Sequence, residues 1–207
     1  MIKENAYRAL SLDWAALETA ASAHLPRLPR AWLAGPLRAP MLFAELEEDR
    51  LAWDELRHAR GIDADAGRLI TSQWTLRDLL SHVCSWTSEF CFQAEAVASG
   101  RRLDYEIVFH PGIGPTEWNH ARVTERRGQS LQQIFEEIDS DTRRLEELVL
   151  SIPATRLNAR TDFACVIGPE RRPLIRSLAD LVLARCFHDR HHLSRIGVWR
   201  AAESHHR

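Results

Sequence analysis

Three short motifs, each directly before a stretch of apolar residues at helical spacing, constrain the fold of this chain most strongly. Each motif places a hydroxyl side chain three residues before a carboxyl or amide side chain: Thr75-Leu76-Arg77-Asp78, Ser130-Leu131-Gln132-Gln133 and Ser177-Leu178-Ala179-Asp180. In such a capping box, the two side chains accept hydrogen bonds from backbone N–H groups that a helix start leaves free. The motifs therefore predict three helices, over residues 75–99, 130–152 and from 177 towards the C-terminus.

Apolar residues at helical spacing predict two further helices, from Ser11 to about Ala23 and from about Met41 to His58. A proline-spaced connector joins these two helices, and loops are expected over residues 61–67, 100–128 and 153–173. No segment carries a convincing alternation of apolar and polar residues, and no internal repeat is present. These patterns predict an all-α fold, a four-helix bundle with long inter-helix connections. We expect an N-terminal helical extension and connector at 1–39, the bundle at 40–200 and a tail at 201–207.

The bulk composition excludes several classes of protein. The 27 lysine and arginine residues stand against 29 aspartate and glutamate residues, and the net charge of −2 disfavours an extended nucleic-acid surface. No apolar run approaches the roughly 18 residues of a membrane span, and the N-terminus lacks the pattern of a secretory signal. The 4 cysteines form no CxxC pair, so we expect them to be reduced and buried in a cytoplasmic protein. Neither nucleic acid nor a membrane is expected as a partner.

Three histidines are the main functional signal. His188 and His192 stand four residues apart, which places both imidazoles on one face of the last predicted helix. His82 belongs to the apolar stripe of residues 75–99, so it too should point into the bundle. Three neutral imidazoles with an open position are the usual ligands of a catalytic divalent metal. The alternative is a set of core histidines satisfied by backbone carbonyls, although each would need a partner for both ring nitrogens.

The motifs that hold these histidines resemble a known family. The stretch from Trp74 to His82, followed by Trp86, is similar to the second-helix signature of the DinB/YfiT-like four-helix-bundle superfamily. Phe187-His188-Asp189-Arg190-His191-His192, continuing through Leu193 to Ile196, is similar to its fourth-helix motif. Trp118-Asn119-His120-Ala121-Arg122 resembles the polar connection that many members have before their third helix. The resemblance covers about residues 40 to 200.

The resemblance implies a fold, a cofactor and a range of activities. Members of this superfamily typically hold a divalent metal, often zinc or nickel, with one histidine from the second helix and two from the fourth. Carried over by motif, these ligands are His82, His188 and His192. Characterised members include thiol S-transferases that use bacillithiol, mycothiol or glutathione, thiol-dependent isomerases, and hydrolases of reactive small molecules. Many other members have no known activity, and homodimers are common, so the resemblance implies a homodimer here.

Several polar residues near these histidines are weaker candidates. Glu89, two turns beyond the first expected ligand, is placed to act as a general base, and His191 as a proton shuttle. A solvated helix carboxylate and a surface histidine are the simpler interpretations of these two residues. Asp189 and Arg190 are expected to form a surface pair, because the histidines beside them point inward.

Aromatic side chains on the same helical stripe are expected to form the wall of a substrate site. Trp86 and Phe90 follow the first expected ligand along its helix, and Trp118 lies on the long connection. Such walls suit a hydrophobic substrate. Asn119 and Arg122 are expected to contact the substrate if the connection folds over the metal, with ordinary loop capping as the alternative.

These features favour a metal-dependent transferase or hydrolase that acts on a small electrophilic molecule, with or without a low-molecular-weight thiol as cosubstrate. Two alternatives from other classes stay open. One is a non-catalytic protein that binds or sequesters a small molecule in the same pocket. The other is a protein with a structural metal, in which a fourth protein ligand closes the site.

Overall fold

The computed structural model describes residues 38–101, 115–159, 161–167 and 172–204 of the chain. The helix predicted over residues 11–23, most of the proline-spaced connector and the last three residues lie outside these described ranges. The described ranges include all four predicted bundle helices. Part of the 100–128 connection and part of the 153–173 loop lie outside them.

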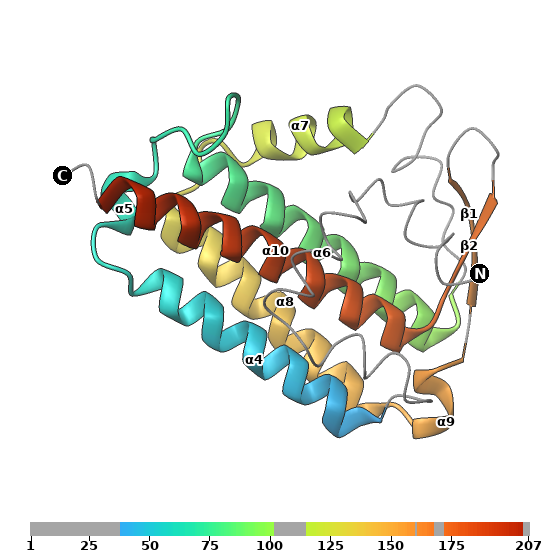
Figure 1. Cartoon of the computed structure of the whole chain (residues 1–207). Helices are drawn as coiled ribbons and strands as arrows, with labels where there is room; N and C mark the ends of the chain where they lie inside the picture. The colour runs from blue at the N-terminus through green and yellow to red at the C-terminus, as the bar shows by residue number, and fades with distance from the viewer. Residues whose placement is uncertain (1–37, 102–114, 160, 168–171, 205–207) are drawn as a thin grey trace.

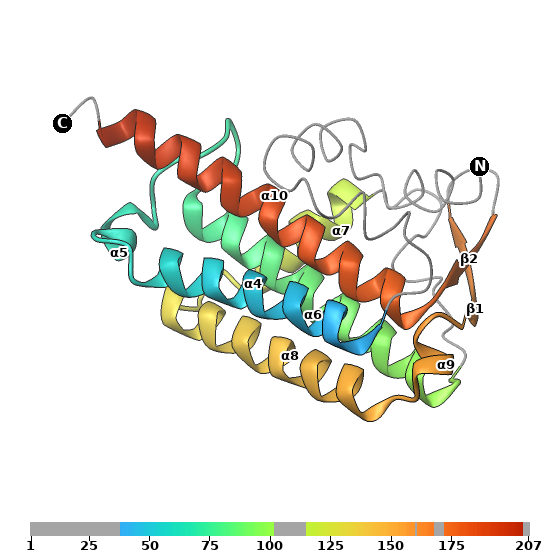
Figure 2. The same ribbon diagram turned by 60° about the horizontal axis from the view of Figure 1, so that its bottom comes forward.

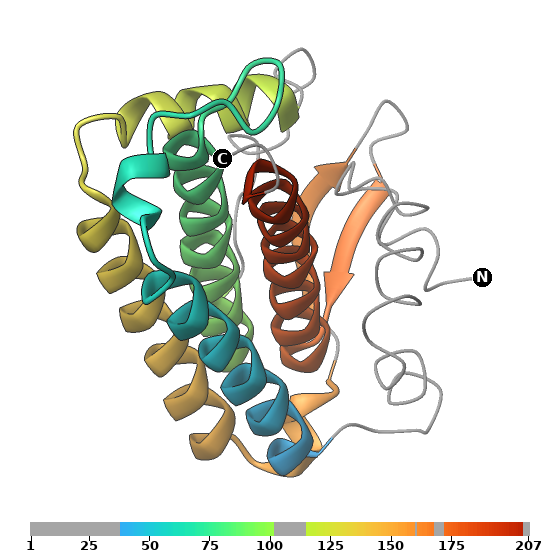
Figure 3. The same ribbon diagram turned by 60° about the vertical axis from the view of Figure 1, so that its left-hand side comes forward.

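Four long helices lie side by side and form the bundle that the sequence predicts (Figures 1 and 3). They are α4 (Ala39–Arg57), α6 (Leu76–Ser99), α8 (Leu131–Ser151) and α10 (Leu178–Ser204). Both α6 and α4 pack against α8 on one side and against α10 on the other. In Figure 1, α4 and α10 run in one direction, and α6 and α8 run in the opposite direction. The all-α fold class is therefore confirmed.

All three capping boxes form as predicted. At the start of α6, the Asp78 backbone N–H donates to Thr75 Oγ1 at 3.2 Å, and the Thr75 N–H donates to Asp78 Oδ2 at 3.0 Å. The equivalent pairs before α8 and α10 have distances between 2.8 and 3.2 Å. The α6 helix ends at Gly100, whose φ of 69° lies in the left-handed region that glycine adopts without strain. Local hydrogen bonds thus fix where each of these helices begins.

The connections contain more regular structure than the sequence predicts. The 100–128 connection includes the helix α7 (Pro115–Glu125), which crosses α6 on the outside of the bundle (Figures 1 and 3). The short helices α5 (Ile62–Asp65) and α9 (Ala154–Leu157) lie in the other two expected loops. The α7 sequence has too few apolar residues for a visible stripe, although a proline at its first position is a helix-start signal.

A two-stranded hairpin also lies in the predicted 153–173 loop. The strand β1 (Thr161–Ile167) pairs antiparallel with β2 (Arg172–Arg176), and the register shifts between Asp162 and Val166. This irregularity interrupts the alternation that would reveal a strand in the sequence. The hairpin lies at the end of the bundle where α8 ends and α10 begins (Figures 1 and 2).

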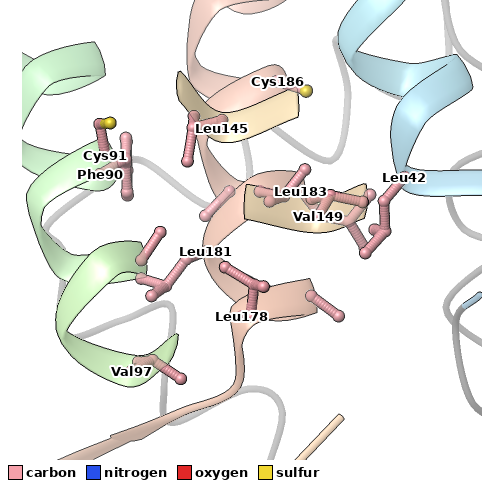
Figure 4. Packing of buried hydrophobic residues seen from close by; sticks show 14 of the residues in the cluster. Leu42, Phe90, Cys91, Val97, Leu145, Val149, Leu178, Leu181, Leu183 and Cys186 are labelled. Carbon is pink, nitrogen blue, oxygen red and sulfur yellow. The ribbon is translucent and has the colours of Figure 1, made fainter. Parts of the chain in front are cut away.

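The apolar core consists of two clusters along the bundle axis. The first joins residues of all four long helices, including Leu42, Phe90, Leu145, Val149 and Leu181, and Figure 4 shows part of it. The second includes Trp53, Leu80, Phe135 and Ile196. Along α10 the first cluster ends at Phe187, so His188 and His192 stand between the two. Within the described ranges, no helix is both long and apolar enough to span a bilayer.

Two leucines on α8 test this description of the core. Leu145 is 0% exposed, whereas Leu150 on the same helix is 65% exposed. We expect Leu145→Ala to lower the free energy of unfolding by about 2–5 kcal/mol, because it removes buried methyl groups and leaves a cavity. Leu150→Ala should change it by less than about 0.5 kcal/mol. Urea unfolding followed by circular dichroism measures both, and equal effects would contradict the assigned orientation of α8.

Candidate metal centre

The three predicted ligands meet in the interior of the bundle. His82 lies on α6, and His188 and His192 lie on α10, which packs against α6 in the opposite direction. All three are buried, with 5%, 1% and 8% of their surface exposed. Their ring centroids lie 4.6 to 5.1 Å apart, and one nitrogen from each ring lies within 4.8 Å of the others. This convergence is what a shared metal ligand set requires.

The nitrogen atoms fit a divalent metal. Nε2 of His82 and Nε2 of His188 lie 3.2 Å apart. Two imidazole ligands at a tetrahedral zinc, with bonds of about 2.0–2.1 Å, would hold their nitrogens about 3.3 Å apart. The Nδ1 atoms of His82 and His192 are buried and have no hydrogen-bond partner within the described part of the chain. An ion held by the facing Nε2 atoms of His82 and His188 would not satisfy Nδ1 of His82, so the 3.2 Å distance between the Nε2 atoms is the observation that supports a metal here.

Burial keeps the three imidazoles neutral. Burial, with smaller contributions from the positive charges of His191 and Arg185, lowers the pKa of His188 to about 3. Burial also lowers the pKa of His192 and of His82 well below the ordinary value, and the neighbouring His188 adds to both effects. At neutral pH each ring therefore offers a lone pair rather than a second proton, which is the form that binds a metal.

Aromatic side chains surround the histidines, as the sequence predicts for two of them on α6. Trp86 and Phe90 lie with their ring centroids 5.9 and 6.2 Å from that of His188. Trp74 lies 5.0 Å from His82 and was not among the predicted site residues. The sequence feature that could have identified Trp74 is its position directly before the capping box of α6, about two helical turns before His82.

The α7 helix brings the residues of the long connection to this aromatic wall. The Trp118 ring lies 4.6 Å from that of Trp86, and the Trp86 indole N–H donates to Asn119 Oδ1 at 2.9 Å. A hydrogen bond with the Asn119 side chain raises the pKa of His82 and so opposes the effect of burial. Arg122 stacks on Trp118 at 5.8 Å and pairs with a glutamate of α7 at 2.7 Å. Asn119 therefore adjoins the histidine cluster, and Trp118 and Arg122 extend the aromatic wall beside it.

The two weaker catalytic candidates lie in different surroundings. Glu89 is half-buried and accepts a hydrogen bond from Gln93 Nε2 at 3.0 Å, and it does not belong to the group of converging ligand atoms. His191 is half-buried, and its ring lies 5.1 Å from that of His192. Of the two, His191 is therefore the residue next to the cluster.

The prediction of a surface pair at Asp189 and Arg190 was wrong. Asp189 is 0% exposed, and Arg190 is half-buried with an ion pair to Glu45 of α4 at 2.9 Å. The prediction assumed that α10 buries only the face that bears the histidines. In the bundle α10 packs against both α4 and α6, so a second face of the helix is buried as well.

The comparison with known families agrees with the fold and the motifs. The family model of the DinB superfamily matches residues 31–196, which is most of the chain. The chain belongs to the DinB superfamily. The match begins before the first bundle helix and ends within α10, so it includes all three histidines.

Solved structures of the same fold add no functional description to this DinB protein. An uncharacterised protein from Escherichia coli UTI89 has a TM-score of 0.62 at 9% identity, over 83% of this chain and 98% of that chain. A protein from Streptococcus pneumoniae has a TM-score of 0.64 at 12% identity, over 81% of this chain and 92% of that chain. At these identities the likeness concerns the fold alone. Among curated proteins, none matches this chain.

The neutral imidazoles of this DinB protein predict a pH dependence of stability. In protein freed of metal by a chelator, the free energy of unfolding should fall between about pH 7 and pH 5. The unfolded chain protonates its imidazoles near 6.5, whereas burial keeps the pKa values in the folded cluster below that, so acid favours unfolding. Each such imidazole adds a slope of at most about 1.4 kcal/mol per pH unit. Urea unfolding at a series of pH values measures it.

Two variants separate this effect from general destabilisation. His188→Phe should reduce the slope, because one of the imidazoles that remain neutral in the fold is removed. Leu145→Ala lowers stability at every pH and should leave the slope as in the wild type. An unchanged slope in His188→Phe would contradict the neutral, buried state of this imidazole.

Proposed function

We propose that this protein is a metal-dependent transferase or hydrolase that acts on a small electrophilic molecule, with or without a low-molecular-weight thiol as cosubstrate. The observation that supports it most is the convergence of exactly the three buried, neutral histidines of two facing helices. In the described ranges, this group of potential ligands includes no fourth member. Three protein ligands favour a catalytic site, since structural zinc sites are closed by four.

His82, His188 and His192 would hold the metal, and we propose zinc or nickel because both accept imidazole ligands. Such an ion supplies Lewis acidity, which favours the deprotonated forms of water and thiols and polarises an electrophile. The protein contributes the neutral state of its ligands, which burial maintains. It also contributes a largely apolar environment in which electrostatic interactions are strong.

The aromatic wall would bind the apolar part of the substrate. All three rings of this wall are 1% to 6% exposed. Trp86 and Phe90 of α6 face His188, and Trp118 of α7 packs on Trp86. Asn119, fixed by its hydrogen bond from Trp86, would orient a polar group of the substrate. Arg122, stacked on Trp118, would supply positive charge at the outer edge of this wall.

A proton donor or acceptor is also needed for either reaction. His191 adjoins the cluster through His192 and is half-buried, so it can exchange protons with solvent. Glu89 lies seven residues after His82, about 10 Å further along α6, and is bonded to Gln93. We therefore propose His191 ahead of Glu89 for this role.

Metal content tests the ligand assignment. Protein without a polyhistidine tag and ending at Glu203, which removes the two histidines near the C-terminus, should contain about one divalent ion per chain. Mass spectrometry should find this ion lost from His82→Ala and His188→Ala. His58→Ala changes an exposed histidine of the same protein and should retain it. Full metal content in His188→Ala would refute the assignment.

Turnover separates an enzyme from a binding protein. We expect a small amount of the metal-loaded protein to consume many equivalents of an electrophile, such as an aryl epoxide with added thiol or an activated ester without it. His188→Ala should abolish this turnover together with metal binding. Consumption that stops at one equivalent per chain for every probe would instead indicate a binding or sequestering protein.

A further inference from the structure

A cluster of buried ionisable groups lies directly behind His188, on the face of α10 turned towards α4. It consists of Asp49 of α4 with Arg185 and Asp189 of α10, and all three side chains are 0% exposed. Arg185 lies between the two carboxyl groups, with Nη1 2.9 Å from Asp49 Oδ2 and Nε 3.1 Å from Asp189 Oδ2. We call these three residues the Asp189 cluster. None of these three residues is among the histidines proposed to bind the metal.

The two oxygens of Asp189 have different neighbours. Oδ2 receives the Trp53 indole N–H at 3.2 Å and faces the Arg185 guanidinium, with the Thr87 hydroxyl at 3.4 Å. Oδ1 lies 3.4 Å from Nδ1 of His188. Oδ2 therefore faces groups from α4, α6 and α10, Asp49 makes a further side-chain hydrogen bond with Asp189, and Oδ1 faces the histidine. His188 in turn directs its other nitrogen, Nε2, towards His82 at 3.2 Å.

Stability alone is a poor explanation for these buried charges. Removing charged groups from water is costly, and replacing a buried ion pair by apolar residues of similar volume often leaves a protein equally or more stable. A cluster that also contacts a metal ligand has a second use. Histidine ligands commonly donate their other ring N–H to a carboxylate, which fixes the tautomer and the orientation of the ring.

We propose that Asp189 is a positioning residue for the metal centre: its Oδ1 holds the proton of His188 on Nδ1, so that the Nε2 lone pair points to the ion. This inference rests on the metal site of the proposed function. Arg185 and Trp53 support Asp189 at its other oxygen, Oδ2. Asp189 thus acts through His188 rather than on a substrate.

A merely structural cluster would behave differently. The ion pair of Asp49 with Arg185 links α4 to α10, and Asp189 pairs with the same arginine. Loss of the carboxyl group of Asp49 or of Asp189 would therefore weaken this link. Only Asp189 contacts His188. Asp49→Asn is therefore the matched control for Asp189→Asn: both replace one buried carboxyl of the same cluster by an amide, and only one of them changes the partner of the histidine.

The tautomer of His188 is the first readout, and it needs no metal. In chelator-treated protein labelled with ¹⁵N, long-range proton–nitrogen NMR reports which ring nitrogen bears the proton, and His188→Gln identifies the signals. We expect the Nδ1–H form in the wild type and in Asp49→Asn, and a mixture of both tautomers in Asp189→Asn. The same tautomer in all three proteins would overturn the proposal.

Metal affinity is the second readout. Competition with a chromophoric chelator should give a zinc affinity about ten- to a hundredfold weaker in Asp189→Asn than in the wild type, and nearly unchanged in Asp49→Asn. The visible spectrum of the cobalt-substituted protein should shift in Asp189→Asn alone, because the orientation of one ligand changes. Equal losses of affinity in the two variants, in proportion to their losses of stability, would overturn the proposal.

A milder variant covers the case in which Asp189→Asn does not fold. Trp53→Phe removes one hydrogen bond to Oδ2 and keeps the carboxylate, so it should shift the tautomer in the same direction by a smaller amount. No change in tautomer in Trp53→Phe would then count against the proposal. If the wild type binds no zinc at all, the proposed function fails, while the tautomer comparison still decides whether Asp189 orients His188.

Discussion

The packing of α6 against α10 is the constraint on which the candidate site depends. Capping boxes at Thr75 and Ser177 fix the first residue of each helix, and the position of every later side chain follows from the helical rise and rotation. Because the two helices run in opposite directions, His82 in the first half of α6 meets His188 and His192 near the middle of α10. A slip of one turn, about 5.4 Å, would separate nitrogens that now lie 3.2 Å apart.

The same packing sets the chemistry of the cluster. Three imidazoles that share one buried site cannot all be charged, since desolvation and mutual repulsion both favour the neutral rings. Neutral rings are good ligands, but their nitrogens are costly to bury without partners. Nδ1 of His188 lies 3.4 Å from the Asp189 carboxyl, and Nε2 of the same ring faces Nε2 of His82 at 3.2 Å. An ion would give the lone pairs of these facing nitrogens a partner, so the arrangement is suited to binding one.

The sequence predicted this site because its signals are local. A capping box needs four residues, and the spacing of His188 and His192 is one turn of helix, so both are visible without knowledge of tertiary contacts. The burial of Asp189 was not visible, because it depends on α4 packing against a second face of α10. The α7 helix was missed because its short, mostly polar segment has weak periodicity and packs on α6, and the hairpin was missed because an irregular register interrupts its alternation.

That second buried face makes α10 the helix that joins the histidine cluster to the rest of the bundle. One face presents the histidines to α6, and the adjacent face presents Arg185 and Asp189 to α4. The α8 helix takes part as well, because Arg185 Nη2 donates to Thr142 Oγ1 at 2.8 Å. A change in how α4 or α8 packs would therefore move the Asp189 carboxyl that lies 3.4 Å from Nδ1 of His188, although neither helix contributes one of the three histidines. The geometry of the centre thus depends on all four long helices and not only on the two that contain histidines.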